Sequence, residues 1–168
     1  MDWQVNGLPL HVLLVHFVVI VVPLAALCTV LAAAWPAARG RLGIVTPLIA
    51  FAALVSVPVT TEAGEWLLAR VANTPLIQAH AIIGKTLLPW AFATFVVATA
   101  QWAWFRYFAA PDGRYRPLAS RKGLRITITI ALAVAVVFLA VGSIVTVVQI
   151  GESGARAIWT GSFTPNPR

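Results

Sequence analysis

The 168-residue sequence is poor in charged residues, and poorest in acidic ones. Only 10% of its residues are charged, with five Asp and Glu against twelve Lys and Arg, whereas 60% are hydrophobic. A soluble domain carries about 25% charged residues. This composition excludes an ordinary soluble domain and predicts an integral membrane protein.

The sequence has one cysteine, Cys28, which excludes an intrachain disulfide and any zinc or iron–sulfur site built from cysteines. It has no phosphate-binding glycine-rich loop, no Ser/His/Asp signature and no H-E-x-x-H motif. Each of these motifs would indicate the chemistry of a soluble enzyme. We therefore expect that the chain is not an enzyme on its own.

Four apolar runs cover most of the sequence, at about residues 8–34, 42–61, 78–107 and 124–150. Each is long enough for a membrane-spanning helix, which needs about 20 residues. The sequence predicts an all-α fold, with residues 1–168 forming a single four-helix membrane domain. Kinks are expected at the prolines inside these runs, which are Pro23, Pro47, Pro58 and Pro89.

The positive charges predict how the helices are oriented. The first and third loops hold eight Lys and Arg, six of them between Arg106 and Arg125, whereas the second loop and the two tails hold three, which are Arg70, Arg156 and Arg168. Cytoplasmic loops are rich in Lys and Arg. We expect both termini outside the bacterial inner (plasma) membrane. The net charge of +7 is explained by this topology and by contact with lipid, so a nucleic-acid partner is not expected.

A short repeat relates the two halves of the chain. Pro9 and Pro23 in the first run are fourteen residues apart, as are Pro75 and Pro89 near and in the third run. Glu62-Ala63-Gly64 after the second run resembles Glu152-Ser153-Gly154 after the fourth. Coincidence in an apolar sequence is one explanation. The other is a pair of helical hairpins related by a pseudo-two-fold axis along the membrane normal.

The outer ends of the four predicted helices gather all three histidines and most of the other polar groups. His11 and His16 begin the first helix, and His80 begins the third. Burying an ionisable side chain within a membrane costs free energy, so such residues indicate a functional site. The neighbouring charged residues at this end are Glu62, Glu65, Lys85, Glu152 and Arg156.

Several kinds of site fit these residues. A bis-histidine b-type haem needs imidazoles from two helices, and His80 is the only histidine outside the first helix. We prefer His16 with His80 as the iron ligands, with His11 and His80 as the other pairing and Arg156 beside the haem propionates. Alternatives are a first-row metal held by imidazole and carboxylate, a proton relay, and interfacial histidines with a purely structural role.

Four stretches carry a resemblance to a known family. They are GLPLHVLLVHF at residues 7–17, Thr-Glu-Ala-Gly at residues 61–64, His80, and GESGARAIW at residues 151–159. Together they resemble the DUF2231 family of four-helix bacterial membrane proteins, in a form typical of actinobacteria. The family has no established activity, and its paired histidines match His11 and His16. Relatives often have a histidine where this chain has Glu152.

The resemblance implies a redox association, because relatives are fused to Rieske-type or cytochrome c domains, which is an argument by association. The function we expect is that of a small redox-associated membrane protein that binds b-type haem near the outer face, with respiratory or redox membrane proteins as its partners. The alternatives are a non-enzymatic accessory subunit or assembly factor of a respiratory or transport complex, and a metal-binding or proton-conducting membrane protein.

Overall fold

The computed structural model describes residues 2–119 and 121–162; Arg168, one of the charges counted above, lies outside them. Long helices dominate the described chain. The elements in chain order are β1 (Gln4–Val5), β2 (Leu8–Pro9), α1 (Leu10–Ala34), α2 (Pro36–Leu42), α3 (Val45–Leu68), α4 (Pro75–Lys85), α5 (Leu87–Ala103), the π-helix η1 (Trp104–Phe108), the 3₁₀-helix η2 (Arg116–Ala119) and α6 (Lys122–Trp159).

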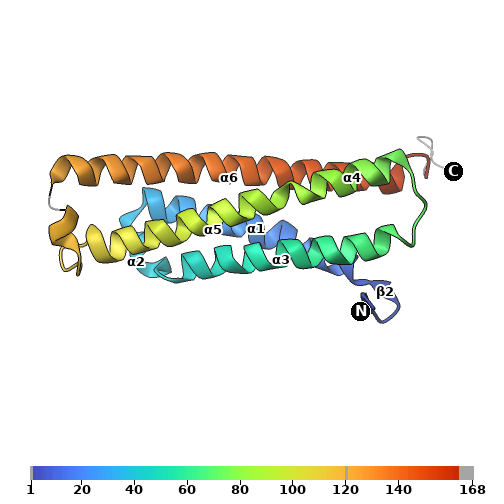
Figure 1. The fold of residues 1–168 in the computed structure, drawn as a ribbon, viewed down its shortest axis with the longest axis horizontal. Coiled ribbons are helices and arrows are strands. Elements are labelled where there is room, and N and C mark those ends of the chain that lie inside the picture. Colours follow the sequence, from blue (N-terminus) through green and yellow to red (C-terminus); the bar gives the residue numbers. More distant parts are fainter. Residues whose placement is uncertain (1, 120, 163–168) are drawn as a thin grey trace.

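The long helices form a four-helix bundle (Figure 1). α1 packs on α3 and α6, and α5 packs on the same two helices from the opposite corner, while α4 lies mainly against α6. The hairpin β1–β2, the loop between α3 and α4 and the end of α6 lie at one end of the bundle. The short helices α2, η1 and η2 lie at the other. We call these the histidine end and the basic end, after His11 and His80 and after Arg39 and Arg106.

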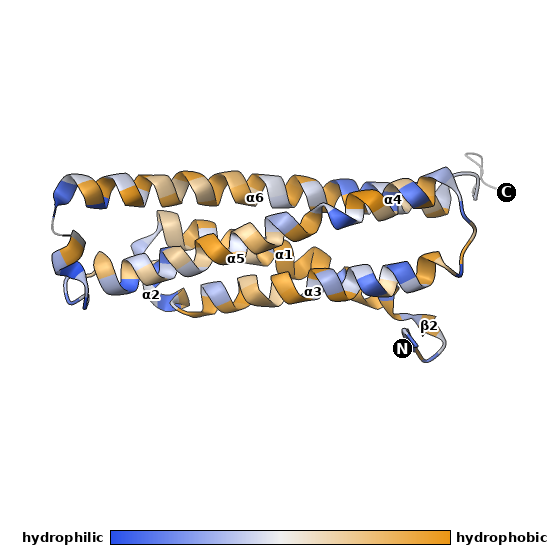
Figure 2. Cartoon of the chain, in the orientation of Figure 1, coloured by the Kyte–Doolittle hydropathy of each residue, from blue (hydrophilic) through white to orange (hydrophobic). Residues whose placement is uncertain are grey.

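The four long helical segments are apolar enough to cross a membrane: Leu10–Ala34, Val45–Leu68, Pro75–Phe108 and Lys122–Trp159. These helices expose large apolar side chains and bury small ones, which is the reverse of the arrangement in a soluble bundle. Large apolar side chains such as Ile20 and Phe138 are 67% and 65% exposed, whereas Ala25, Ala50 and Ala98 are buried between helices. Small residues at helix contacts and large apolar ones facing outward are typical of membrane bundles. The protein is a multi-pass membrane protein, with its hydrophilic residues gathered toward the two ends (Figure 2).

Two helices continue beyond the ends of their apolar runs. α3 ends at Leu68 rather than near residue 61, and α6 ends at Trp159 rather than near residue 150. A drop in hydropathy marks where a segment leaves the lipid, which need not be where its helix ends. The alanines and glutamates that follow these two apolar runs favour helix. With 38 residues, α6 is about 57 Å long at 1.5 Å per residue, longer than the roughly 30 Å hydrocarbon core of a bilayer. The ends of the bundle therefore project beyond the hydrocarbon.

The third segment is two helices rather than one. α4 ends at Lys85 and α5 begins at Leu87, with Thr86 between them. Pro89 explains the break, because proline has no N–H to bond the carbonyl four residues earlier and its ring collides with that carbonyl, here of Lys85. Pro47 lies in the first turn of α3, where a missing N–H breaks no helical bond. Pro23 and Pro58 lie inside α1 and α3, which both continue past them.

A two-residue hairpin precedes α1. Gln4 pairs with Pro9 and Val5 with Leu8, and the turn residues Asn6 and Gly7 have φ values of 51° and 77°. Positive φ at both central residues defines the type I′ turn, for which Asn-Gly is the preferred sequence. The Asn6-Gly7 sequence could have predicted this hairpin. It was not predicted because Leu8 and Pro9 of the second strand were assigned to the apolar run that starts at residue 8.

Candidate functional site

His11 joins the first turn of α1 to α3. Its Nδ1 lies 2.9 Å from the backbone oxygen of Thr60, and the side chain is partly buried. A carbonyl oxygen only accepts, so Nδ1 carries the proton and donates it. In a neutral imidazole this leaves Nε2 with a free lone pair, available to a ligand or a metal.

His80 makes the corresponding contact between α4 and α6. Its Nδ1 lies 3.0 Å from Oγ of Ser153, and the Ser153 hydroxyl donates to the backbone oxygen of Ile150 at 3.0 Å. Because that hydroxyl has already donated its proton, it accepts from Nδ1 of His80. The Nε2 atom of His80 is again left with a lone pair.

The structure brings His11 and His80 together and leaves His16 apart from them. The ring centroids of His11 and His80 are 6.4 Å apart, and their planes are inclined by 76°. His16 is exposed on α1, and its Nδ1 donates to the backbone oxygen of Val12 in the same helix at 2.6 Å. Residues five apart on a helix point about 140° apart, so only one histidine of α1 can meet His80.

Each of the two histidines lies against a glycine of the repeated motif. A Cβ added to Gly64 would lie 2.9 Å from Nδ1 of His11, and one added to Gly154 would lie 3.1 Å from Cε1 of His80. These are the glycines of the two Glu-x-Gly sequences. The second helix of each hairpin, α3 or α6, thus places a glycine against the histidine of the first, α1 or α4. This arrangement favours the pseudo-two-fold interpretation of the repeat.

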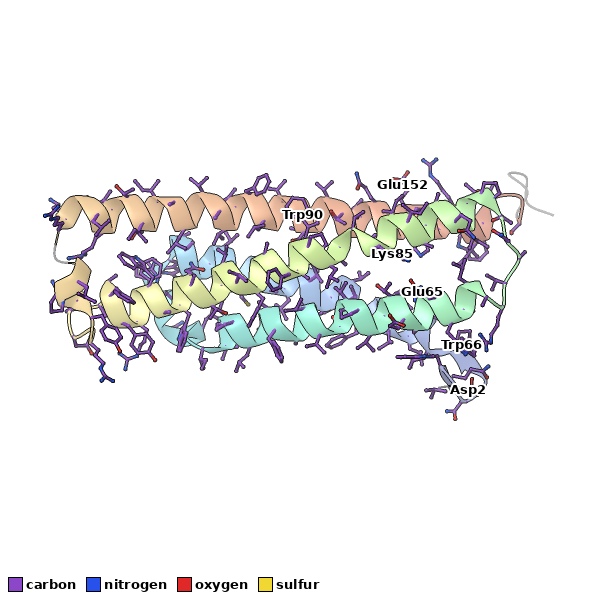
Figure 3. The ribbon with its side chains drawn as sticks, in the orientation of Figure 1. Asp2, Glu65, Trp66, Lys85, Trp90 and Glu152 are labelled. Atoms are coloured by element: carbon purple, nitrogen blue, oxygen red, sulfur yellow. The ribbon has the colours of Figure 1, made fainter. Side chains whose placement is uncertain are left out.

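The charged residues at the histidine end form two exposed pairs. Nζ of Lys85 lies 2.7 Å from a carboxylate oxygen of Glu65, and a guanidinium nitrogen of Arg156 lies 2.6 Å from Oε1 of Glu152 on the same helix. Glu62 is exposed as well. Figure 3 shows Glu65, Lys85 and Glu152 toward the same end of the bundle. Exposed pairs contribute about 0–1 kcal/mol each to stability, so they adjust the charge near the histidines without being needed for the fold.

The number of available ligands decides what the two histidines can hold. Within residues 2–119 and 121–162, no group of three or more His, Cys, Asp and Glu side chains is placed to bind a metal ion. A bare ion such as zinc needs three or four protein ligands. Haem iron takes its other four ligands from the porphyrin, so two imidazoles on different helices complete it. Two imidazoles on different helices are the protein ligands that a bis-histidine haem requires.

The basic end contains a second group of polar residues, which the sequence analysis did not identify as a site. Arg39 on α2 donates from Nε to the backbone oxygen of Ala32 at 2.7 Å and from Nη2 to that of Ala33 at 2.9 Å. Its guanidinium carbon lies 3.4 Å from the centroid of the Phe105 ring. Arg39 therefore caps the last carbonyls of α1. Burial lowers the pKa of this guanidinium, and arginine stays protonated in proteins.

Comparison of the chain with protein-family models, with curated proteins and with solved structures gave no match. The site is therefore interpreted from its own geometry.

Proposed function

We propose that this protein binds b-type haem between α1 and α4, with His11 and His80 as the axial ligands of the iron. The observation that carries the proposal is the meeting of two imidazoles from different helices, 6.4 Å apart between centroids, each with its Nδ1 atom hydrogen bonded. His11 and His80 would hold the haem from two different helices, and the bound haem would supply the redox-active iron. His11 replaces His16 as the preferred partner of His80.

The surrounding residues would orient the ligands. The backbone oxygen of Thr60 and the hydroxyl of Ser153 hold the two Nδ1 atoms, which is the role that outer hydrogen-bond partners play at metal sites. Arg156, one turn beyond Ser153 on α6, is the cation proposed for a haem propionate. A bound haem supplies one-electron chemistry, so the proposed function is electron transfer in association with respiratory or other redox membrane proteins.

We further propose that the chain is a member of the DUF2231 family. The stretches that carry this resemblance meet at the histidine end: His11 lies against Gly64 of the Thr-Glu-Ala-Gly sequence, and His80 lies against Gly154 of GESGARAIW. These contacts place residues from all four stretches in one part of the molecule, as expected if the family's shared residues form a common site.

An absorption spectrum of the purified protein tests the haem proposal. Protein expressed with an ample haem supply and purified in detergent should show a Soret band and the sharp visible bands of low-spin bis-histidine iron on reduction. A colourless protein would rule the proposal out. Metal uptake or proton flux that depends on pH, without a Soret band, would instead favour a metal-binding or proton-conducting protein.

A non-enzymatic accessory subunit is the second candidate, and one observation favours it. Both histidines already have hydrogen-bond partners, and each joins the two helices of its hairpin, as structural residues do. In that case the protein would purify colourless together with a partner complex, and alanine at His11 or His80 would lower the thermal stability of the bundle without any spectral change.

We propose that the histidine end faces outward from the bacterial inner membrane, supported by the excess of Lys and Arg at the basic end. Cysteines placed in a Cys28→Ala background test this. Leu118→Cys at the basic end, where the native side chain is 74% exposed, should react with a membrane-impermeant maleimide only after lysis. Val71→Cys, between α3 and α4, should react in intact cells or spheroplasts. The opposite labelling pattern would reverse the orientation.

A further inference from the structure

A cavity of about 250 Å³ opens at the basic end, between α2 and the ends of α1, α3 and α5. The polar residues that line it are Arg39, Thr46, Gln101 and Arg106, and the aromatic ones are Trp102 and Phe105. A second cavity of about 460 Å³ shares Arg39 and Phe105 with the first and adds Arg125 and Thr129. The stacked pair of Arg39 and Phe105 thus forms a common wall.

Two buried polar atoms belong to residues that line the first cavity, and neither has a hydrogen-bond partner in the described part of the chain. They are Oε1 of Gln101 and Oγ1 of Thr46, on side chains that are 2% and 3% exposed. The Gln101 amide is held by its nitrogen, which donates to the backbone oxygen of Thr29 at 3.3 Å. A buried polar atom without a partner destabilises the fold, so a polar molecule that bonds these two atoms in the cavity would be bound favourably.

The charges around the two cavities are all of one sign. Arg39, Arg106 and Arg125 line them, and none of the lining residues is acidic. Arg39 uses Nε and Nη2 to cap α1, and arginine has five N–H donors in all, so further donors remain on Nη1 and Nη2. A ligand for this site must carry a negative charge for the arginines and a hydrogen-bond donor for Oε1 of Gln101.

We propose that this cavity binds the headgroup of an anionic phospholipid that carries free hydroxyl groups, such as phosphatidylglycerol. The phosphate contacts Arg39 and Arg106, a headgroup hydroxyl donates to Oε1 of Gln101, and Thr46 completes the hydrogen bonds. The position supports a lipid, because α1 ends and α3 begins beside the cavity, which places it at the membrane surface. Arginine is the residue best suited to phosphate, and basic pockets between membrane helices bind anionic headgroups.

Native mass spectrometry of the full-length protein, purified into mixed micelles, tests the proposal. The micelles contain equal amounts of phosphatidylglycerol, phosphatidylcholine and phosphatidylmethanol, which has the charge of phosphatidylglycerol but no hydroxyl. The wild type should retain phosphatidylglycerol preferentially. Equal retention of phosphatidylcholine would overturn the anionic site, and equal retention of phosphatidylmethanol would overturn the role of Gln101.

Variants localise the binding. Arg106→Gln should lower phosphatidylglycerol retention about tenfold, as expected for one charge-assisted hydrogen bond, and Gln101→Leu should lower it about fivefold. Arg114→Gln removes an exposed charge from the same end without touching either cavity, so it should change nothing. An equal effect of Arg114→Gln would show a diffuse charge effect and overturn the site. Displacement of the lipid by millimolar glycerol 3-phosphate would overturn the lipid and assign the cavity to a soluble phosphate ester.

Discussion

Replacing His80 with alanine should abolish low-spin haem binding while the bundle still inserts into the membrane. His80 is the only histidine outside α1, so no other imidazole can replace it opposite His11. Helix insertion depends on the apolar residues that follow, which this change leaves intact. Bound haem per protein, measured by the pyridine haemochrome assay, should fall at least tenfold. Any remaining haem should be high-spin, with one axial histidine.

The other two histidines provide matched comparisons. His11→Ala should be as severe as His80→Ala, whereas His16→Ala should leave the spectrum unchanged, because His16 is exposed and bonds only to its own helix. Ser153→Ala removes the acceptor that orients His80 and should weaken haem binding roughly tenfold, the lower limit for loss of an outer hydrogen-bond partner. A His80→Ala variant with an unchanged low-spin spectrum would refute this ligand assignment even if haem is present.

Gly142→Ala should destabilise the bundle more than any other glycine-to-alanine change in α6. A Cβ at position 142 would lie 2.1 Å from the ring of Trp90, far inside van der Waals contact. Trp90 also packs on Phe138, with the ring centroids 5.5 Å apart, so its ring cannot move without disturbing α6 again. Overpacking of this kind costs about 1–3 kcal/mol. Thermal unfolding in detergent, followed by circular dichroism, should show a lower Tm.

Gly151→Ala is the control for that experiment. Gly151 lies on the same helix, and a Cβ there meets no atom within 4 Å. Alanine is favoured over glycine inside a helix by about 0.5–1 kcal/mol, so this variant should keep or raise the Tm. Equal Tm values for the two variants would mean that Trp90 does not pack on Gly142 as the structure shows.

The sequence by itself predicted an all-α membrane protein with four segments long and apolar enough to span a bilayer. Lipid cannot satisfy exposed backbone polar groups, so long apolar runs of this length must become helices. The structure has one long helix on the first, second and fourth runs and two consecutive helices, α4 and α5, on the third. The histidines and charged residues had to lie toward the ends of those helices, because ionisable side chains are costly inside a membrane. The sequence also showed that His80 must belong to any two-helix histidine site. It could not set the helix ends, because the residues after the apolar runs of α3 and α6 still favour helix in water.

Only the tertiary structure decided which residues meet. Spacing along one helix predicts that His11 and His16 point in different directions, but not which of them faces His80. In the structure His11 faces His80, because Gly64 and Gly154 allow α1 to pack closely on α3 and α4 to pack closely on α6. The sequence offered several carboxylates as possible partners of Lys85, and in the structure Lys85 pairs with Glu65. The proposed lipid site depends on an oxygen of Gln101 that has no partner among the described residues, and the sequence shows Gln101 only as one polar residue in an apolar run. Contacts between helices depend on their rotation and crossing, which side chains far apart in the sequence set together.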